Sequence, residues 1–151
     1  MNKHIRLLIE NITDDIFNDD LFNTDDTYTT ISNDIFCSYH PKTNEELRKL
    51  LGHLFVERGK DADLNDIDVS NITDMSNLFK NLNPPNIDIR YWDVSNVENM
   101  SYMFSGCTKF TGKGLGNWNP IKCKNMTCMF YDCSNFDCDL SDWDVRNVKM
   151  M

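Results

Sequence analysis

Four cysteines in the C-terminal third of the chain have the residue type and the regular spacing from which a metal site could be built. Cys123, Cys128, Cys133 and Cys138 follow one another at intervals of five residues. Structural zinc sites usually pair their cysteines about two to four residues apart, so this spacing matches zinc poorly. In the sequence repeat described below, Cys133 repeats the position of Cys107. Cys123 falls at the apolar position of Val97 and Val148, where cysteine serves as a small apolar side chain. We therefore predict no metal site and no cofactor.

A cluster of acidic and amide residues suggests a second cation site. Asp61, Asp63, Asn65 and Asp66 resemble the start of a calcium-binding loop. Such a loop needs glycine at its sixth position and glutamate at its twelfth. Those positions are Asp66 and Ile72 here. We interpret the cluster as a solvated acidic turn.

The sequence contains little from which a catalytic centre could be assembled. His4, His40 and His53 lie in unrelated contexts outside the repeats. We find no Gly-x-Ser-x-Gly turn, phosphate-binding glycine loop or His-Glu-x-x-His helix. We therefore predict no catalytic residues, and an enzyme ranks third behind two kinds of binding protein.

A sequence repeat of about 25 residues organises the chain after residue 60. Three columns of large apolar residues keep the same phase, and a single extra residue falls in the Gly-rich stretch 111–116. A unit of this size buries its apolar face only by stacking on its neighbours. The columns are Met75, Met100, Met126 and Met151; Phe79, Phe104 and Phe130; and Trp92, Trp118 and Trp143.

These repeats predict an α/β repeat fold, a short leucine-rich-repeat-like solenoid with parallel short strands and helical turns. About three and a half repeats occupy residues 61–151. Met100, Met103 and Phe104 fall on one face of a predicted helical turn at residues 99–106. The short strand is predicted between Phe110 and Trp118, and again between the equivalent residues 136 and 143.

Two predicted helices precede the repeats. Thr43 and Glu46 form a capping box at the start of an N-terminal capping helix within residues 41–60. Residues 1–40 form an acidic N-terminal arm with a possible amphipathic helix. That helix packs either on the body of this protein or on another chain. Its apolar face consists of Ile5, Leu8, Ile9, Ile12 and Ile16.

The repeat motifs resemble those of the BspA-like leucine-rich-repeat family. Residues 62–79 and 92–107 carry the resemblance, which extends over about residues 41–151. Residues 119–122, Asn-Pro-Ile-Lys, replace the Asp-Val-Ser-Asn element of the other repeats. The resemblance implies a curved repeat fold and a role in adhesion or protein binding, and it supplies no catalytic residues.

Charge and hydropathy limit the classes of partner. The net charge of −9 disfavours a phosphate backbone, so we expect no nucleic acid partner. No apolar stretch approaches the roughly 18 residues that span a bilayer. The sequence also lacks a recognisable signal peptide. We therefore expect a cytoplasmic or virion-associated protein in preference to a secreted one.

We predict a non-enzymatic protein-protein interaction or scaffold module, a structural or accessory component of a larger assembly such as a phage particle. The alternative is a secreted or surface-attached adhesin of the BspA type. The sequence stops inside a fourth repeat, which predicts an open C-terminal end suited to self-association. Residues beyond 151, or a partner, would cover this end. Candidate partner-binding residues, besides the apolar face of the arm, are Tyr91, Tyr102, Lys109, Lys113, Lys122, Tyr131, Met150 and Met151.

Overall fold

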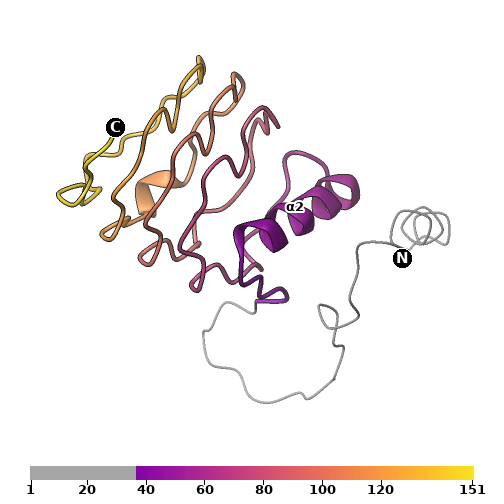
Figure 1. The fold of residues 1–151 in the computed structure, drawn as a ribbon. Helices are drawn as coiled ribbons and strands as arrows, with labels where there is room; N and C mark the ends of the chain where they lie inside the picture. Colours follow the sequence, from indigo (N-terminus) through magenta and orange to yellow (C-terminus); the bar gives the residue numbers. More distant parts are fainter. Residues whose placement is uncertain (1–36) are drawn as a thin grey trace, which may run out of the picture. The chain divides into compact units, whose positions relative to one another are not determined.

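The computed structural model describes residues 37–151 (Figure 1). The amphipathic helix predicted in the N-terminal arm, with Ile5, Leu8, Ile9, Ile12 and Ile16, lies outside the described residues. Two helical elements occur in the described part of the chain: α2 (Asn44–Arg58) and the short 3-10 helix η2 (Leu115–Asn117). We number the repeats 1 to 4, at residues 64–88, 89–114, 115–139 and 140–151. Figure 1 shows them side by side in this order, beginning next to α2.

Helix α2 begins and ends where the sequence predicts. Thr43 has an extended backbone, and its side chain accepts a hydrogen bond from the backbone N–H of Glu46 at 3.2 Å. The Glu46 carboxylate in turn accepts the backbone N–H of Lys42 at 2.7 Å. Gly59 ends the helix with a φ of 81°, a conformation that favours glycine. The buried face consists of Leu47, Leu50, Leu51 and Leu54.

One set of the backbone hydrogen bonds between repeats forms a ladder in which every bond runs in the same direction, from one repeat to the next. An N–H group of one repeat donates to a carbonyl oxygen of the next repeat, at alternate residues and at 2.8 or 2.9 Å. We call these donors the ladder amides. They are Asn77, Phe79 and Asn81 in repeat 1, and Tyr102, Phe104 and Gly106 in repeat 2.

The prediction of an α/β solenoid with parallel strands and helical turns is wrong. Residues 37–151 contain no strand and no sheet, and the repeats are paired only by isolated parallel bridges such as Asp74 to Asn99. The predicted helical turn at residues 99–106 is a succession of tight turns. Tyr102 there has a φ of 56°, and Cys128 in repeat 3 has a φ of 51°. A residue with positive φ interrupts both helix and strand, so neither extends through the repeat.

The interior of the stack is built from columns of aromatic rings. Phe79, Phe104 and Phe130 are stacked with ring centroids 5.2 and 5.7 Å apart. The neighbouring column of Trp92, Trp118 and Trp143 has centroids 6.3 Å apart at both steps. Repeats 2 and 3 contribute a ring to both columns, repeat 1 to the phenylalanine column and repeat 4 to the tryptophan column, so the apolar core runs continuously through the stack.

The extra residue of repeat 2 is accommodated in the Gly-rich stretch, as the sequence predicts. The chain forms η2 there, the 3-10 helix at Leu115–Asn117. Gly112 has a φ of 80°, and a Cβ atom on it would lie 2.4 Å from the ring of Phe136. A larger residue is excluded at this position by both the backbone conformation and the close contact.

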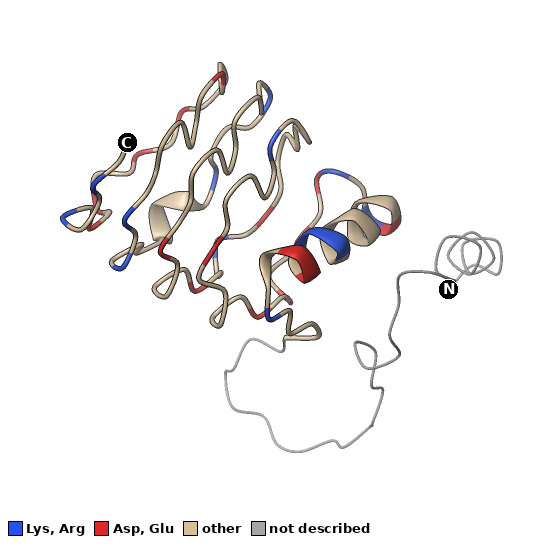
Figure 2. Cartoon of the chain, in the orientation of Figure 1, with Lys and Arg blue, Asp and Glu red and all other residues tan. Residues whose placement is uncertain are grey.

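Charged residues occur at the turns of the repeats and along α2 (Figure 2). Within residues 37–151, no helix is both long enough and apolar enough to cross a membrane.

Candidate protein-binding surface

Residues of repeats 3 and 4 line an apolar hollow. Its volume is about 610 Å³. Apolar side chains around it are unusually exposed for their type: 68% for Tyr131, 40% for Val145 and 81% for Met151. We call it the terminal-repeat surface. Its lining residues are Met126, Cys128, Met129, Phe130, Tyr131, Leu140, Ser141, Trp143, Val145 and Met151.

Three backbone N–H groups on repeat 3 are the counterparts of the ladder amides. They belong to Cys128, Phe130 and Asp132, and none of them has a hydrogen-bond acceptor among residues 37–151. The backbone N–H of Met126, two residues before Cys128, donates to the carbonyl oxygen of Met150 at 2.8 Å. The terminal-repeat surface therefore joins an apolar hollow to a row of backbone donors that have no acceptor within residues 37–151.

The tryptophan column shows a second kind of bond between repeats. The indole N–H of Trp143 donates to the carbonyl oxygen of Leu115 at 2.8 Å, and this oxygen also accepts the backbone N–H of Trp118. In repeat 4 the equivalent carbonyl is that of Leu140. It accepts only the backbone N–H of Trp143 among the described residues. Leu140 therefore adds one free acceptor position to the terminal-repeat surface.

Helix α2 occupies one of the equivalent positions at the other end of the stack. The carbonyl oxygen of Ser76 corresponds to the ladder acceptors in repeats 2 and 3, and it accepts a hydrogen bond from the side-chain amide of Asn44 at 3.0 Å. Arg48 donates to the neighbouring carbonyl oxygen of Asn77 at 2.6 Å. The Asn44 side chain thus replaces one of the backbone donors that a preceding repeat would supply.

A second, polar hollow of about 780 Å³ lies between α2 and the first two repeats. Arg58 forms two hydrogen bonds of 2.9 Å to the Asp66 carboxylate, and Arg90 pairs with Asp88 at 2.7 Å. The hydrogen bonds that Arg58 donates to Asp66 raise the pKa of Arg58, and the hydrogen bond that Asp88 accepts from Arg90 lowers the pKa of Asp88. The charges of this hollow are thus largely paired with one another, which makes it a weaker candidate binding site than the terminal-repeat surface.

The acidic turn considered for calcium forms part of this polar hollow. The Asp63 carboxylate accepts hydrogen bonds from the backbone and side chain of Asn65 at 2.9 and 2.8 Å. Among residues 37–151, no group of three or more His, Cys, Asp or Glu side chains is arranged to hold a metal ion.

The cysteines have free thiols and occupy different environments. Cys107 and Cys133 hold equivalent positions, and each thiol donates to a carbonyl oxygen of the preceding repeat at 3.1 Å. Burial raises the pKa of both thiols, to about 11 for Cys133. Cys128 differs because it is exposed and lines the terminal-repeat surface.

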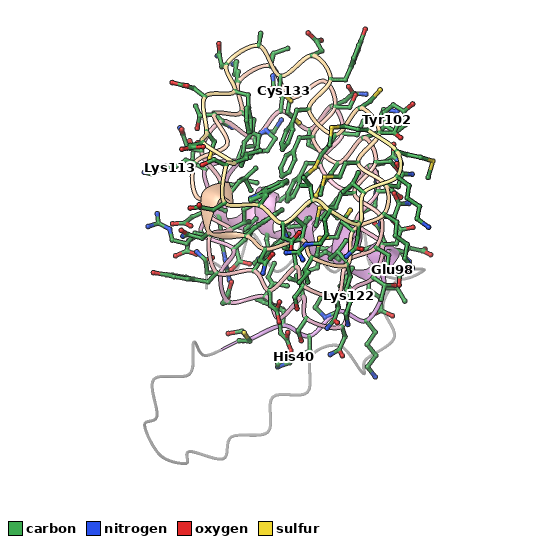
Figure 3. All side chains as sticks on the ribbon, turned by 90° about the vertical axis from the view of Figure 1, so that its left-hand side faces the viewer. His40, Glu98, Tyr102, Lys113, Lys122 and Cys133 are labelled. Carbon is green, nitrogen blue, oxygen red and sulfur yellow. The ribbon has the colours of Figure 1, made fainter. Side chains whose placement is uncertain are left out.

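The structure distributes the predicted partner-binding residues over several sides of the molecule. Seen along the stack in Figure 3, Lys113 and Tyr102 lie on opposite sides, and Lys122 lies near Glu98 on a third side. The Tyr102 ring lies under the Lys80 ammonium group, 4.9 Å from it. Tyr91 is 60% exposed and lines the polar hollow. These residues therefore do not form one face.

Two of the predicted residues, Tyr131 and Met151, do line the terminal-repeat surface. Met150 is 53% exposed beside them, whereas the side chain of Lys109 is exposed elsewhere on repeat 2. Sequence analysis missed Leu140 and Val145 as surface residues, because the repeat pattern marks both as ordinary apolar positions. No following repeat among residues 37–151 covers these two side chains.

The fold and surface define a protein of stacked 25-residue repeats, closed by a helix at one end and apolar at the other. The chain belongs to the family described as "Mycoplasma protein of unknown function, DUF285", whose model matches residues 49–151. The match takes in the later part of α2 and every described repeat. No curated protein and no solved structure matches the chain.

Proposed function

We propose that this chain is a non-enzymatic protein-binding module that serves as a scaffold or accessory component of a larger assembly. The observation that carries the proposal is the terminal-repeat surface, where an apolar hollow of about 610 Å³ adjoins unsatisfied backbone donors. A large exposed apolar patch often marks an interaction site, and each donor gains a modest net free energy, about 0.5–1.5 kcal/mol, when a protein acceptor replaces water.

The sequence resemblance to BspA-like proteins supports the same class of function, since that resemblance implies adhesion or protein binding. The aromatic columns support it as well. Phe130 and Trp143 end these columns at the terminal-repeat surface. Clusters of buried aromatic residues are the usual centres of protein interfaces.

The proposal is tested by photo-cross-linking in the cells that make this protein. A photoreactive phenylalanine analogue replaces Tyr131 in one variant and Val56 in a matched control. Val56 is a suitable control because it is 83% exposed on α2. We expect one protein to be cross-linked from position 131 and not from position 56. Failure to cross-link from 131, or equal cross-linking from both positions, would contradict the proposal.

A further inference from the structure

A hollow lined by lysines, separate from the terminal-repeat surface, lies across repeats 2, 3 and 4. Its volume is about 290 Å³, and it shares no lining residue with the terminal-repeat surface. We propose that it binds an acidic segment of a partner protein, whose carboxylates pair with the lysine ammonium groups. We call it the lysine hollow. Its lining residues are Glu98, Lys122, Lys124, Asn147 and Lys149.

The first argument is the local excess of positive charge. Three lysines line the hollow with a single carboxylate, that of Glu98, although the whole chain has a net charge of −9. The Lys124 ammonium pairs with Glu98 at 2.8 Å, whereas that of Lys122 donates to the neutral side chain of Asn96 at 2.7 Å. A cleft lined by one sign of charge attracts a ligand of the opposite sign. The lysine hollow therefore selects an anionic partner.

The second argument is the direction in which these lysines reach. Lys122 and Lys124, both on repeat 3, pair with side chains of repeat 2, the repeat before their own. Lys149 holds the position of Lys124 one repeat later, and its backbone N–H donates to the Lys124 carbonyl oxygen at 2.9 Å. The same backward reach thus leads Lys149 to another lysine. Like charges on neighbouring paired backbones repel each other, and an incoming carboxylate relieves this repulsion.

The third argument is that Lys122 departs from the structural pattern of the repeat. Asn96 and Asn147 hold the equivalent position in repeats 2 and 4. Their side-chain amides donate to backbone carbonyl oxygens of the preceding repeat, those of Ser70 at 2.9 Å and Ile121 at 2.7 Å. Lys122 donates to the Asn96 side chain instead. Repeat 3 therefore exchanges a bond that joins two backbones for a charged group that lines the hollow.

The lysine hollow is open although repeats pack on either side of its residues. The side chains of Lys124 and Glu98 are 54% and 51% exposed, even though a following repeat pairs with each of them. Lys122 and Lys149 are exposed as well. Figure 3 shows Lys122 and Glu98 together on one side of the stack. Stacking of repeats thus leaves these side chains accessible to a partner.

The chemistry of the hollow favours carboxylates over phosphate groups. Phosphate sites often use the fork of an arginine or the backbone N–H groups of a glycine-rich loop or helix N-terminus. None of the lining residues is arginine or glycine. The Glu98 carboxylate already shows the kind of group that these lysines accept as a partner.

The experiment measures the binding of fluorescein-labelled octaglutamate to the full 151-residue chain by fluorescence anisotropy. We expect saturable binding in about 50 mM salt, weakened at least about tenfold in about 500 mM salt because the pairs are exposed. Octaglutamine with the same label should not bind, since it has the same length and no charge.

A pair of matched variants locates the binding. One variant carries Lys122→Gln and Lys149→Gln, and the control carries Lys109→Gln and Lys113→Gln, two lysines that are exposed outside the hollow. Both variants lose the same charge. We expect the first to bind octaglutamate at least about tenfold more weakly, and the control to bind within about twofold of the unmodified chain. Circular dichroism verifies that both variants fold.

Four results would overturn the inference. The first two are absence of octaglutamate binding and an equal loss of binding in the two variants. The third is displacement of octaglutamate by inorganic phosphate but not by glutamate at the same ionic strength, which would assign the hollow to phosphate groups. The fourth is self-association in sedimentation that the Lys122 and Lys149 substitutions abolish, which would make a second copy the occupant. Cross-linking from position 131 tests the proposed function at a different surface, so either idea can fail without the other.

Discussion

Replacing Phe104 by alanine removes the ring that connects three repeats. Phe104 is fully buried, and its ring stacks on Phe79 at 5.2 Å, on Phe110 at 4.3 Å and on Phe130 at 5.7 Å. Truncation of a buried phenylalanine to alanine costs about 3–5 kcal/mol of unfolding free energy. The free energy of unfolding of a whole domain is about 5–15 kcal/mol, so the variant should still fold but with a much smaller free energy of unfolding.

Urea denaturation followed by tryptophan fluorescence and circular dichroism measures this loss. With a slope of about 2 kcal/mol per molar urea, the midpoint should fall by about 2 M while the slope stays unchanged. The matched control is Tyr131→Ala, because this side chain is 68% exposed and its loss should change stability by less than about 0.5 kcal/mol. A loss below about 1 kcal/mol for Phe104→Ala would refute the continuous aromatic core.

Three other predictions concern α2, the carboxylates and the thiols. Asn44→Ala removes the hydrogen bond to the Ser76 carbonyl oxygen and should cost about 1 kcal/mol in the same urea assay. The pKa of Asp88 is lowered in the folded protein by Arg90, so its stabilising contribution is present above the unfolded pKa of about 4. This contribution is lost as the pH falls through the lowered folded value, and Asp88→Asn should therefore reduce the acid-induced loss of stability. Iodoacetamide at neutral pH should alkylate the exposed Cys128 well before the buried Cys107, whose pKa is raised by burial.

Each of these predictions has an outcome that contradicts it. Unchanged stability of Asn44→Ala would mean that α2 does not close the first repeat through this bond. An acid titration that is the same for Asp88→Asn as for the unmodified protein would remove the role of the Arg90 pair. The alkylation is measured by peptide mass spectrometry. Equal rates for Cys128 and Cys107 would show that the repeat interior is open to solvent.

The repeat register and α2 could be predicted from the sequence, because both depend on local patterns. The apolar columns recur every 25 or 26 residues, and the leucine face of α2 follows a helical period after a capping box. The backbone conformation inside the repeat could not be predicted in the same way. Tyr102 and Cys128 adopt positive φ angles, although neither residue type favours them. These angles produce the tight turns that replace the expected strands and helical turns.

The terminal-repeat surface was only partly predictable, for a related reason. Tyr131 and Met151 were expected to be exposed, and both line the terminal-repeat surface. The direction of the ladder depends on the orientation of each peptide group relative to the stacking direction of the repeats. No pattern of side chains in the sequence determines this orientation. The three unsatisfied donors at Cys128, Phe130 and Asp132 therefore became visible only with the backbone.

Amide hydrogen exchange of the free protein, measured by NMR, tests the terminal-repeat surface most directly. The ladder amides of repeat 2 are bonded to repeat 3, whereas Cys128, Phe130 and Asp132 have no acceptor among residues 37–151. We predict that these three amides exchange at least about 100-fold faster than their repeat-2 equivalents. Comparable exchange rates in the two repeats would contradict the one-way ladder and the binding surface built on it.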